Sequence, residues 1–269
     1  MGNILDKENG YLTLLSTATR RPIDIVEISC PGARDAMFNM DDSKIFTTCQ
    51  QEPKGMAVID VEARKEIKMV PIKGGRAGGM DPQGKYFMVS ASKSVHFFDS
   101  QTAELVKTIK VPGGGGNFTC LKDGSKCYVG LRKANAVGVI DMAKLELMKT
   151  IETGPDANRL YLNPGNSRYG LFANEAGKSD IVSIIDTQLD VKVKDIWTGL
   201  GPHNVAFDPD GKFAVISTKK ENVATLVDTG SADPNDWDVI TTDLDSGIQN
   251  NGVRWVPSPA ALKKALAQN

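Results

Sequence analysis

A short apolar segment that ends in aspartate recurs along the chain and constrains its fold more than any other feature. The regular copies end at Asp60, Asp99, Asp141, Asp186 and Asp228. A degenerate copy over residues 11–16 carries Ser16 in place of the aspartate. Successive copies are 44, 39, 42, 45 and 42 residues apart. A period near 40 residues indicates an array of similar structural units.

A second motif alternates with the first and predicts a hairpin in each unit. Its clearest copy is Asp208-Pro209-Asp210-Gly211-Lys212, which lies between the apolar segments 204–207 and 213–217. Proline presets the first corner of such a turn, and glycine accepts the positive φ at its end. The other copies begin at Asn39, Asp81, Leu121 and Asn163.

One complete unit therefore contains four strands, at about 203–207, 213–218, 223–228 and 237–242. Four short antiparallel strands in about 42 residues form a propeller blade, and a blade buries its faces only by stacking on others. We expect one all-β propeller domain over residues 1–269. The predicted blades cover about 30–72, 73–112, 113–153, 154–199 and 200–242, with a split blade from 1–29 and 243–269.

The blade count that fits best is six, and seven is the alternative. In the split blade, Gly252-Val253-Arg254-Trp255 fits a first strand, and Asn3-Ile4-Leu5 could supply a second. Closing the ring in this way would leave no unpaired strand edge. Residues 259–267 are rich in alanine and leucine and begin with proline, which predicts a short C-terminal helix.

These repeats resemble the YVTN-type β-propeller family. The closest copy is the stretch from Gly201 to Lys212, and Ile184-Ile185-Asp186-Thr187 carries the other half of the repeat. Members of that family include surface-layer domains, heavy chains of amine dehydrogenases, hydrazine synthase subunits, lactonases and the domain that holds haem d1. The resemblance therefore implies a propeller without implying one function, because the same fold serves many purposes.

The start of each first strand is where a propeller places side chains at one mouth of its channel. The aligned copies put Arg34, Arg76, Gly116, Asn158, His203 and Asn251 at equivalent positions, and Arg159 follows Asn158. Converging guanidinium groups bind carboxylate or phosphate. The predicted ligand-binding residues are Arg34, Arg76, Asn158, Arg159, His203 and Asn251, for a small anionic ligand or the acidic loop of a partner. The alternative is that the arginines pair with neighbouring carboxylates, as Arg34 could with Asp35.

His203 is the candidate catalytic residue, because an imidazole at the mouth could act as a general base. In that enzymatic form, Arg34 and Arg76 would hold the anion. The chain has only one other histidine, His96, which falls on a third strand away from the mouth. We therefore expect no metal site built from several histidines.

The four cysteines form two candidate disulfides. Cys120 and Cys127 lie on the two arms of one predicted hairpin, and Cys30 and Cys49 bracket another more widely. Both pairs would suit a periplasmic or other extracytoplasmic compartment, whereas free thiols in a cytoplasmic protein are the alternative. No Cys-x-x-Cys motif is present, so we expect no covalently bound haem.

The amino-acid composition excludes some classes of binding partner. The chain has 32 Lys and Arg against 33 Asp and Glu, a balance that argues against nucleic-acid binding. No apolar run is long enough for a membrane span. Residues 1–6 lack signal-peptide features, as a mature chain without its leader also would.

Glycine runs at 74–75, 78–79 and 113–116 are expected at blade junctions rather than in phosphate loops. The acidic stretch 233–238 is expected to be a solvated loop rather than a calcium site.

We therefore expect a binding or scaffold propeller that presents its faces to protein partners. It could be the cofactor-free subunit of a periplasmic redox complex, whose other subunits would carry haem or quinone. The alternatives are a small-molecule site for an anion, such as a lactone or a carboxylate-bearing tetrapyrrole, and a cell-surface adhesion module. Whether the chain is itself an enzyme is left open.

Overall fold

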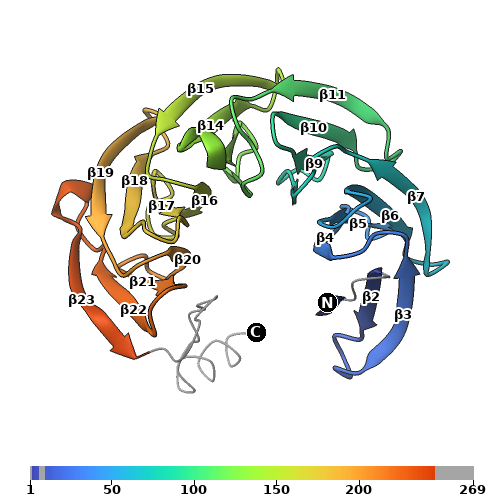
Figure 1. Cartoon of the computed structure of the whole chain (residues 1–269), viewed down its shortest axis with the longest axis horizontal. Helices are drawn as coiled ribbons and strands as arrows, with labels where there is room; N and C mark the ends of the chain where they lie inside the picture. The colour runs from blue at the N-terminus through green and yellow to red at the C-terminus, as the bar shows by residue number, and fades with distance from the viewer. Residues whose placement is uncertain (1, 6–9, 246–269) are drawn as a thin grey trace. The chain divides into compact units, whose positions relative to one another are not determined.

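The described residues form six antiparallel sheets, which confirms the expected six-bladed all-β fold (Figure 1). The computed structural model describes residues 2–5 and 10–245. The predicted strand at 252–255, the predicted helix at 259–267 and Asn251 lie outside the described residues. Within the described part, helix is limited to two short 3₁₀ turns, η1 (Arg132–Ala134) and η2 (Pro234–Asp236). No helix there is long and apolar enough to cross a membrane.

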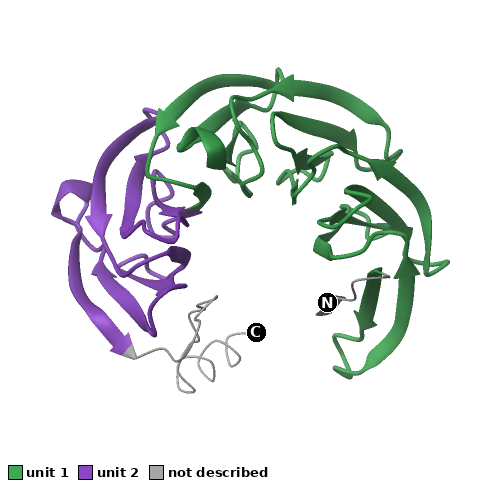
Figure 2. Cartoon of the chain, in the orientation of Figure 1, with its two compact units in different colours: residues 1–160 green, residues 161–269 purple. Residues whose placement is uncertain are grey.

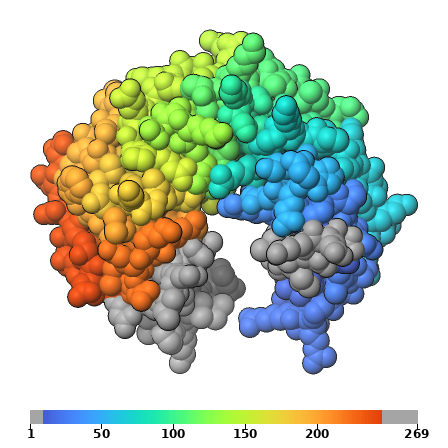
Figure 3. All heavy atoms as spheres, viewed as in Figure 1, coloured from blue at the N-terminus to red at the C-terminus, as the bar shows by residue number. Residues whose placement is uncertain are grey.

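The chain separates into two compact units, residues 1–160 and 161–269 (Figure 2). The boundary falls inside β16, the first strand of the fifth sheet. In the first unit, atoms of consecutive blades form a continuous surface (Figure 3).

The strands follow the predicted blades closely. The first sheet contains β1 (Gly2–Leu5), β2 (Gly10–Leu15) and β3 (Pro22–Ile28). The second contains β4 (Ala33–Phe38), β5 (Lys44–Cys49), β6 (Gly55–Asp60) and β7 (Lys65–Pro71). The third contains β8 (Ala77–Met80), β9 (Tyr86–Ser90), β10 (Ser94–Asp99) and β11 (Leu105–Lys110).

The remaining sheets repeat this order. The fourth contains β12 (Phe118–Cys120), β13 (Lys126–Leu131), β14 (Ala136–Asp141) and β15 (Glu146–Glu152). The fifth contains β16 (Ala157–Leu162), β17 (Tyr169–Asn174), β18 (Ile181–Asp186) and β19 (Val191–Trp197). The sixth contains β20 (Pro202–Phe207), β21 (Phe213–Thr218), β22 (Val223–Asp228) and β23 (Asp238–Asp245).

The first sheet has three strands among the described residues. Its strand β1 pairs with β2 over Gly2 to Leu5, so Asn3-Ile4-Leu5 supplies the second strand that the sequence left in question. β2 then pairs with β3, as third and fourth strands do in the other blades.

The hydrophobic core lies between successive blades rather than inside any one of them. Second and third strands such as β5 and β6 are buried along almost their whole length, because both faces of each sheet are covered. Outer strands such as β11 bury only occasional residues. One cluster joins Ile45 and Ile59 of the second blade to Leu12 and Val26 of the first. A separate cluster in the second unit is built around Trp237, which is 1% exposed.

The turn motif closes each first hairpin as predicted. In the sixth blade, Asp208 Oδ1 accepts the backbone N–H of Phe213 at 2.8 Å. In the third blade, Asp81 Oδ1 accepts the N–H of Tyr86 at 2.6 Å. The glycines that end these turns have positive φ, +70° at Gly211 and +64° at Gly84. The motif therefore fixes where each first strand meets its second, and with it the position of the strand that carries the candidate site.

Candidate functional site

The described members of the predicted ligand-binding set lie at the start of the first strands. Arg34 and Asn158 are the second residues of β4 and β16, and His203 is the second residue of β20. Arg76 immediately precedes β8. The repeat therefore places these positions equivalently in their blades. Arg34, Arg76 and Asn158 belong to the first unit and His203 to the second.

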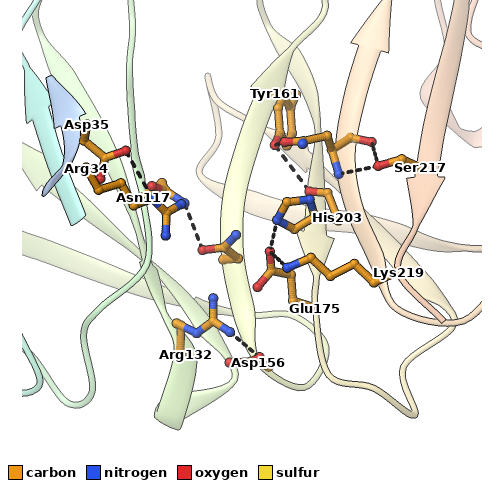
Figure 4. A network of polar contacts seen from close by, with 12 residues as sticks. Arg34, Asp35, Asn117, Arg132, Asp156, Tyr161, Glu175, His203, Ser217 and Lys219 are labelled. Atoms are coloured by element: carbon orange, nitrogen blue, oxygen red, sulfur yellow. Dashed lines mark hydrogen bonds and ion pairs between the residues drawn. The ribbon is translucent and has the colours of Figure 1, made fainter. Parts of the chain in front are cut away.

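Arg34 forms the neighbouring ion pair that the sequence offered as an alternative to ligand binding. Its Nε lies 3.4 Å from Asp35 Oδ1, and its side chain is 42% exposed (Figure 4). The other oxygen of Asp35 accepts the backbone N–H of Gly78 at 3.2 Å. Arg34 and Asp35 thus tie the second blade to the third.

Asn158 is held inside the first unit. Asn117 donates from its side-chain nitrogen to Asn158 Oδ1 at 3.0 Å and from its backbone N–H to the Asn158 carbonyl at 2.9 Å. Asn158 is 4% exposed, whereas Arg159 beside it is exposed. These contacts give Asn158 a structural role between the fourth and fifth first strands.

Arg76 lines a cavity of about 570 Å³ in the first unit. Among the other predicted candidates in this unit, Arg34, Asn158 and Arg159 do not line it. Four cationic side chains and one carboxylate face the cavity, which we call the basic cavity. Its charged lining residues are Lys54, Arg76, Arg132, Lys133 and Asp156.

Glycines form part of the lining of the basic cavity, at Gly74, Gly75, Gly114 and Gly115. Three of their backbone N–H groups are used inside the fold: Gly75 donates to the Ile72 carbonyl at 2.9 Å, Gly114 to the Ser92 carbonyl at 2.9 Å, and Gly115 to Ser90 Oγ at 2.8 Å. A Cβ on Gly114 would lie 2.0 Å from the Ala91 carbonyl oxygen. The glycines thus allow close backbone packing, and recognition of a ligand falls to the side chains around them.

The expectation that all three glycine runs lie at blade junctions is wrong for Gly78 and Gly79. Both belong to strand β8. A Cβ on Gly78 would lie 2.6 Å from Phe87 Cζ, and one on Gly79 would lie 2.9 Å from Phe118 Cβ. These glycines are therefore needed where aromatic side chains pack directly against the first strand.

Arg132 and Asp156 form an ion pair in the wall of the basic cavity (Figure 4). Arg132 begins the short helix η1, directly after β13, and its side chain is 12% exposed. Asp156 lies in the connection before β16. This contact therefore links the end of a second strand to the start of the next first strand.

The second unit contains a separate polar cluster around His203 (Figure 4). His203 Nε2 lies 2.6 Å from Glu175 Oε1, and Lys219 Nζ lies 3.3 Å from the same oxygen. The Glu175 side chain is 5% exposed and that of His203 is 17% exposed. A buried carboxylate that contacts one imidazole nitrogen fixes the orientation of the ring. This geometry suits a positioned histidine, whether its role is structural or chemical.

Neighbouring groups hold the backbone around His203. The Tyr161 hydroxyl donates to the His203 carbonyl at 3.3 Å and also to Asn204 Oδ1. The backbone N–H of Asn204 donates to Ser217 Oγ at 3.1 Å. The start of β20 is therefore rigidly placed by side chains from β16 and β21.

Sequence reasoning missed a second set of equivalent positions, the residue that directly follows each second strand. Gln50, Arg132, Glu175 and Lys219 occupy it after β5, β13, β17 and β21. Gln50 Nε2 donates to the backbone carbonyl of Arg76 at 3.0 Å, whereas Glu175 contacts the imidazole side chain of His203. Extending the repeat alignment by one residue past each second strand would have revealed this set.

The remaining candidates have structural roles. His96 lies between Ser94 Oγ, 2.9 Å from Nε2, and Thr108 Oγ1, 3.1 Å from Nδ1. Burial lowers the pKa of His96, so its neutral form is favoured. In the acidic stretch 233–238, Asp233 Oδ1 accepts the N–H of Asn235 at 2.9 Å and caps η2. Within residues 2–5 and 10–245, no group of three or more metal-ligating side chains is assembled.

Both candidate cysteine pairs are joined in the structure. Cys30 and Cys49 are bonded with their Cα atoms 5.1 Å apart, and Cys120 and Cys127 with theirs 3.9 Å apart. Cys120 and Cys127 face each other directly in the register of β12 and β13. The Cys30–Cys49 bond links the connection after β3 to the end of β5. The Cys120–Cys127 bond joins the two strands of the β12–β13 hairpin.

Comparison with solved structures shows the β-propeller fold. Hydrazine synthase from Kuenenia stuttgartiensis matches with a TM-score of 0.68 and 16% identity, over 93% of this chain and 84% of that chain. A candidate 6-phosphogluconolactonase from Bacteroides uniformis matches with a TM-score of 0.69 and 14% identity, over 91% of this chain and 81% of that chain. A similar protein from Bacteroides fragilis matches with a TM-score of 0.68 and 17% identity, over 89% and 78%.

No protein-family profile matches the chain, and no curated protein matches it in sequence. At these identities the structural likeness defines the class, a β-propeller, and leaves its activity to be argued from the site.

Proposed function

We propose that the chain is a binding propeller that takes an anionic ligand in the basic cavity. One observation carries this proposal: Lys54, Arg76, Arg132 and Lys133 line one cavity of about 570 Å³, with Asp156 as the single carboxylate. A cavity of this volume is typical of small-molecule sites. The whole chain has a net charge of −1, so this concentration of positive charge is local.

The positive side chains reach the cavity from three blades. Lys54 comes from the loop after β5, Arg76 from the connection to β8, and Arg132 with Lys133 from the loop after β13. Guanidinium and ammonium groups form their strongest hydrogen bonds with carboxylates and phosphates. A concave site with such groups also concentrates anions from solution.

The proposal is tested by isothermal titration calorimetry with inorganic phosphate, citrate and a neutral sugar in buffer of low ionic strength. We expect phosphate or citrate to bind with a single site and the sugar to give no signal. Arg76→Ala should weaken the binding by about tenfold, because a charge-assisted contact contributes about 1.5 kcal/mol or more.

Arg21→Ala is the matched control, because Arg21 is exposed and does not line the basic cavity. It removes the same charge and should leave anion affinity unchanged. If no anion binds to the unaltered protein, or if both arginine variants weaken binding equally, the proposed site is wrong.

A second candidate function is that of a scaffold for a protein partner, including the role of cofactor-free subunit in a redox complex. It is favoured by large apolar side chains exposed on outer strands, among them Ile23 and Ile25 on β3 and Trp197 on β19, which is 68% exposed. Exposed aromatic residues are frequent anchors of protein interfaces. The likeness to hydrazine synthase is compatible with such a role and is limited to the fold.

Native mass spectrometry of the untagged, nonreduced protein from its source tests the scaffold role. The scaffold role would be supported if the protein copurifies with haem- or quinone-bearing chains and a Trp197→Ser variant does not. A protein that remains a single chain in its source extract would contradict it. The two disulfides support an oxidising compartment, periplasmic or otherwise extracytoplasmic.

A further inference from the structure

We infer that the ligand of the basic cavity is a compact molecule with two anionic groups, phosphate or carboxylate, joined by a short neutral linker. This inference rests on the proposed function and names its ligand class. It comes from how the cationic side chains are distributed around the glycine segment 113–115, of which Gly114 and Gly115 line the cavity.

Two cationic side chains are anchored at opposite ends of the segment 113–115. A Cβ on Gly115 would lie 3.5 Å from Arg76 Cδ, so the Arg76 stem passes beside that residue. A Cβ on Gly113 would lie 3.1 Å from Lys133 Cβ, so the Lys133 stem starts beside the other end. Residues two positions apart are separated by at most about 7 Å along an extended chain. The two cations thus begin a short distance apart on one backbone platform.

The residue between these two ends, Gly114, carries no charged side chain. Gly114 lies in the middle of the segment, and Gly74 and Ser92 are the neighbouring lining residues. The backbone N–H groups of Gly114 and Gly115 are already bonded within the protein. A neutral linker can lie against this surface, whereas a third anionic group there would meet no cationic side chain.

Two lysines, Lys54 and Lys133, also line the cavity. Among the described residues, neither Lys54 nor Lys133 forms a side-chain ion pair with a carboxylate. Glu52 accepts the backbone N–H of Lys54 rather than its ammonium group. Lys133 follows Arg132, which is engaged with Asp156, so Lys133 supplies the charge for a ligand at that end.

The test compares two probes that differ by one phosphate, fructose 6-phosphate and fructose 1,6-bisphosphate, by calorimetry at low ionic strength. We expect the bisphosphate to bind at least about tenfold more tightly, because it can contact both cationic ends. Glutarate, a dicarboxylate with a neutral linker, and butyrate, its monocarboxylate counterpart, distinguish carboxylate from phosphate as the preferred group.

Lys133→Ala should remove most of the advantage of the bisphosphate, measured as the ratio of its affinity to that of fructose 6-phosphate on the same variant. Lys149→Ala is the control, because Lys149 is exposed on β15 and does not line the cavity. A thermal melt of each variant shows that it is folded, and Lys133→Gln repeats the test with a longer polar side chain.

The possible failures are distinguishable. Equal affinities for both members of each probe pair would overturn the inference of two anionic groups and leave the proposed anion site standing. No binding of any anionic probe would overturn the proposed function, and the inference with it. An equal loss in Lys133→Ala and Lys149→Ala would show that the advantage of a second charge arises from the general field of the protein, which also contradicts the inference.

Discussion

At the scale of single residues, the aspartate that ends each third strand acts on the backbone of the following turn. Asp99 Oδ1 accepts the N–H groups of Gln101 and Thr102 at 2.9 and 2.8 Å. In the first blade, Ser16 Oγ accepts the N–H of Thr19 at 3.1 Å. The Ser16 hydroxyl can take the place of the aspartate carboxylate, because both side chains can accept a hydrogen bond from the turn.

We predict that Asp99→Ala lowers the free energy of unfolding by about 1 kcal/mol near neutral pH, because the turn N–H groups lose their acceptor. The Thr102 N–H, and after it the Gln101 N–H, hold the pKa of Asp99 below its usual value. A lowered pKa in the folded state stabilises the protein above the usual aspartate pKa of about 3.9, and this contribution is lost as pH falls. Denaturant titration at about pH 7 and about pH 3 should show the difference from the unaltered protein narrowing at low pH.

Asp99→Asn separates the hydrogen bond from the charge. An asparagine oxygen can still accept the turn N–H groups, so this variant should be less destabilised than Asp99→Ala, and its own stability should depend less on pH. An Asp99→Ala effect that is the same at both pH values would show that the ionised form of the carboxylate does not matter.

At the scale of elements, each blade depends on a tight first turn that contacts its neighbour. In the second unit, Asn163 Nδ2 donates to the Gly211 carbonyl at 2.7 Å, so the turn of the sixth blade is bound to that of the fifth. A Cβ on Gly211 would lie 1.8 Å from Asn163 Oδ1. The conformation of this turn therefore depends on the positive φ of Gly211 and on its contact with Asn163 of the adjacent blade.

We predict that Gly211→Ala destabilises the protein by about 1–3 kcal/mol, because it combines a side chain at positive φ with this clash. Gly177→Ala serves as the comparison, since its Cβ would meet the flexible end of the Lys220 side chain at 3.0 Å. Thermal unfolding of both variants measures the difference. Equal melting temperatures would show that the Gly211 turn can rearrange freely.

Hairpins and strand order could be predicted from the sequence because turn chemistry and apolar periodicity are local properties. The strand bounds of the sixth blade follow directly from its Asp208-Pro209-Asp210-Gly211 motif. The basic cavity was only partly predictable. Arg76 was found by aligning first strands, whereas Lys54 and Lys133 lie in loops of differing length, which such an alignment does not match.

Contacts between side chains of neighbouring blades were the hardest features to predict from the sequence. Gln50 and Arg76, or Glu175 and His203, are separated by more than twenty residues and meet only because successive blades stack. The contact of Gly79 in β8 was missed for the same reason, since Phe118 packs on it from the next blade. A pattern within one repeat cannot indicate which side chain the next repeat brings against it.

At the scale of the whole molecule, the net charge gives no indication of the local positive charge that the proposed function needs. The chain has nearly equal numbers of acidic and basic residues, yet four cationic side chains line one cavity of the first unit. Net charge governs solubility and long-range steering, whereas a local concentration of one sign governs what a cavity binds. The sequence total of −1 is therefore a poor guide to the ligand.

The bond between Cys30 and Cys49 also sets how the chain responds to mechanical force. In a repeat array each unit is held mainly by its neighbours, so pulling from the ends would extend the blades one after another. The 19-residue segment closed by this bond cannot lengthen while the bond is intact. Fully extended at roughly 3.4 Å per residue, this segment of a reduced molecule is about 60 Å longer than in an oxidised one, whose bonded Cα atoms stay 5.1 Å apart. The contour length thus reports the redox state of a single molecule.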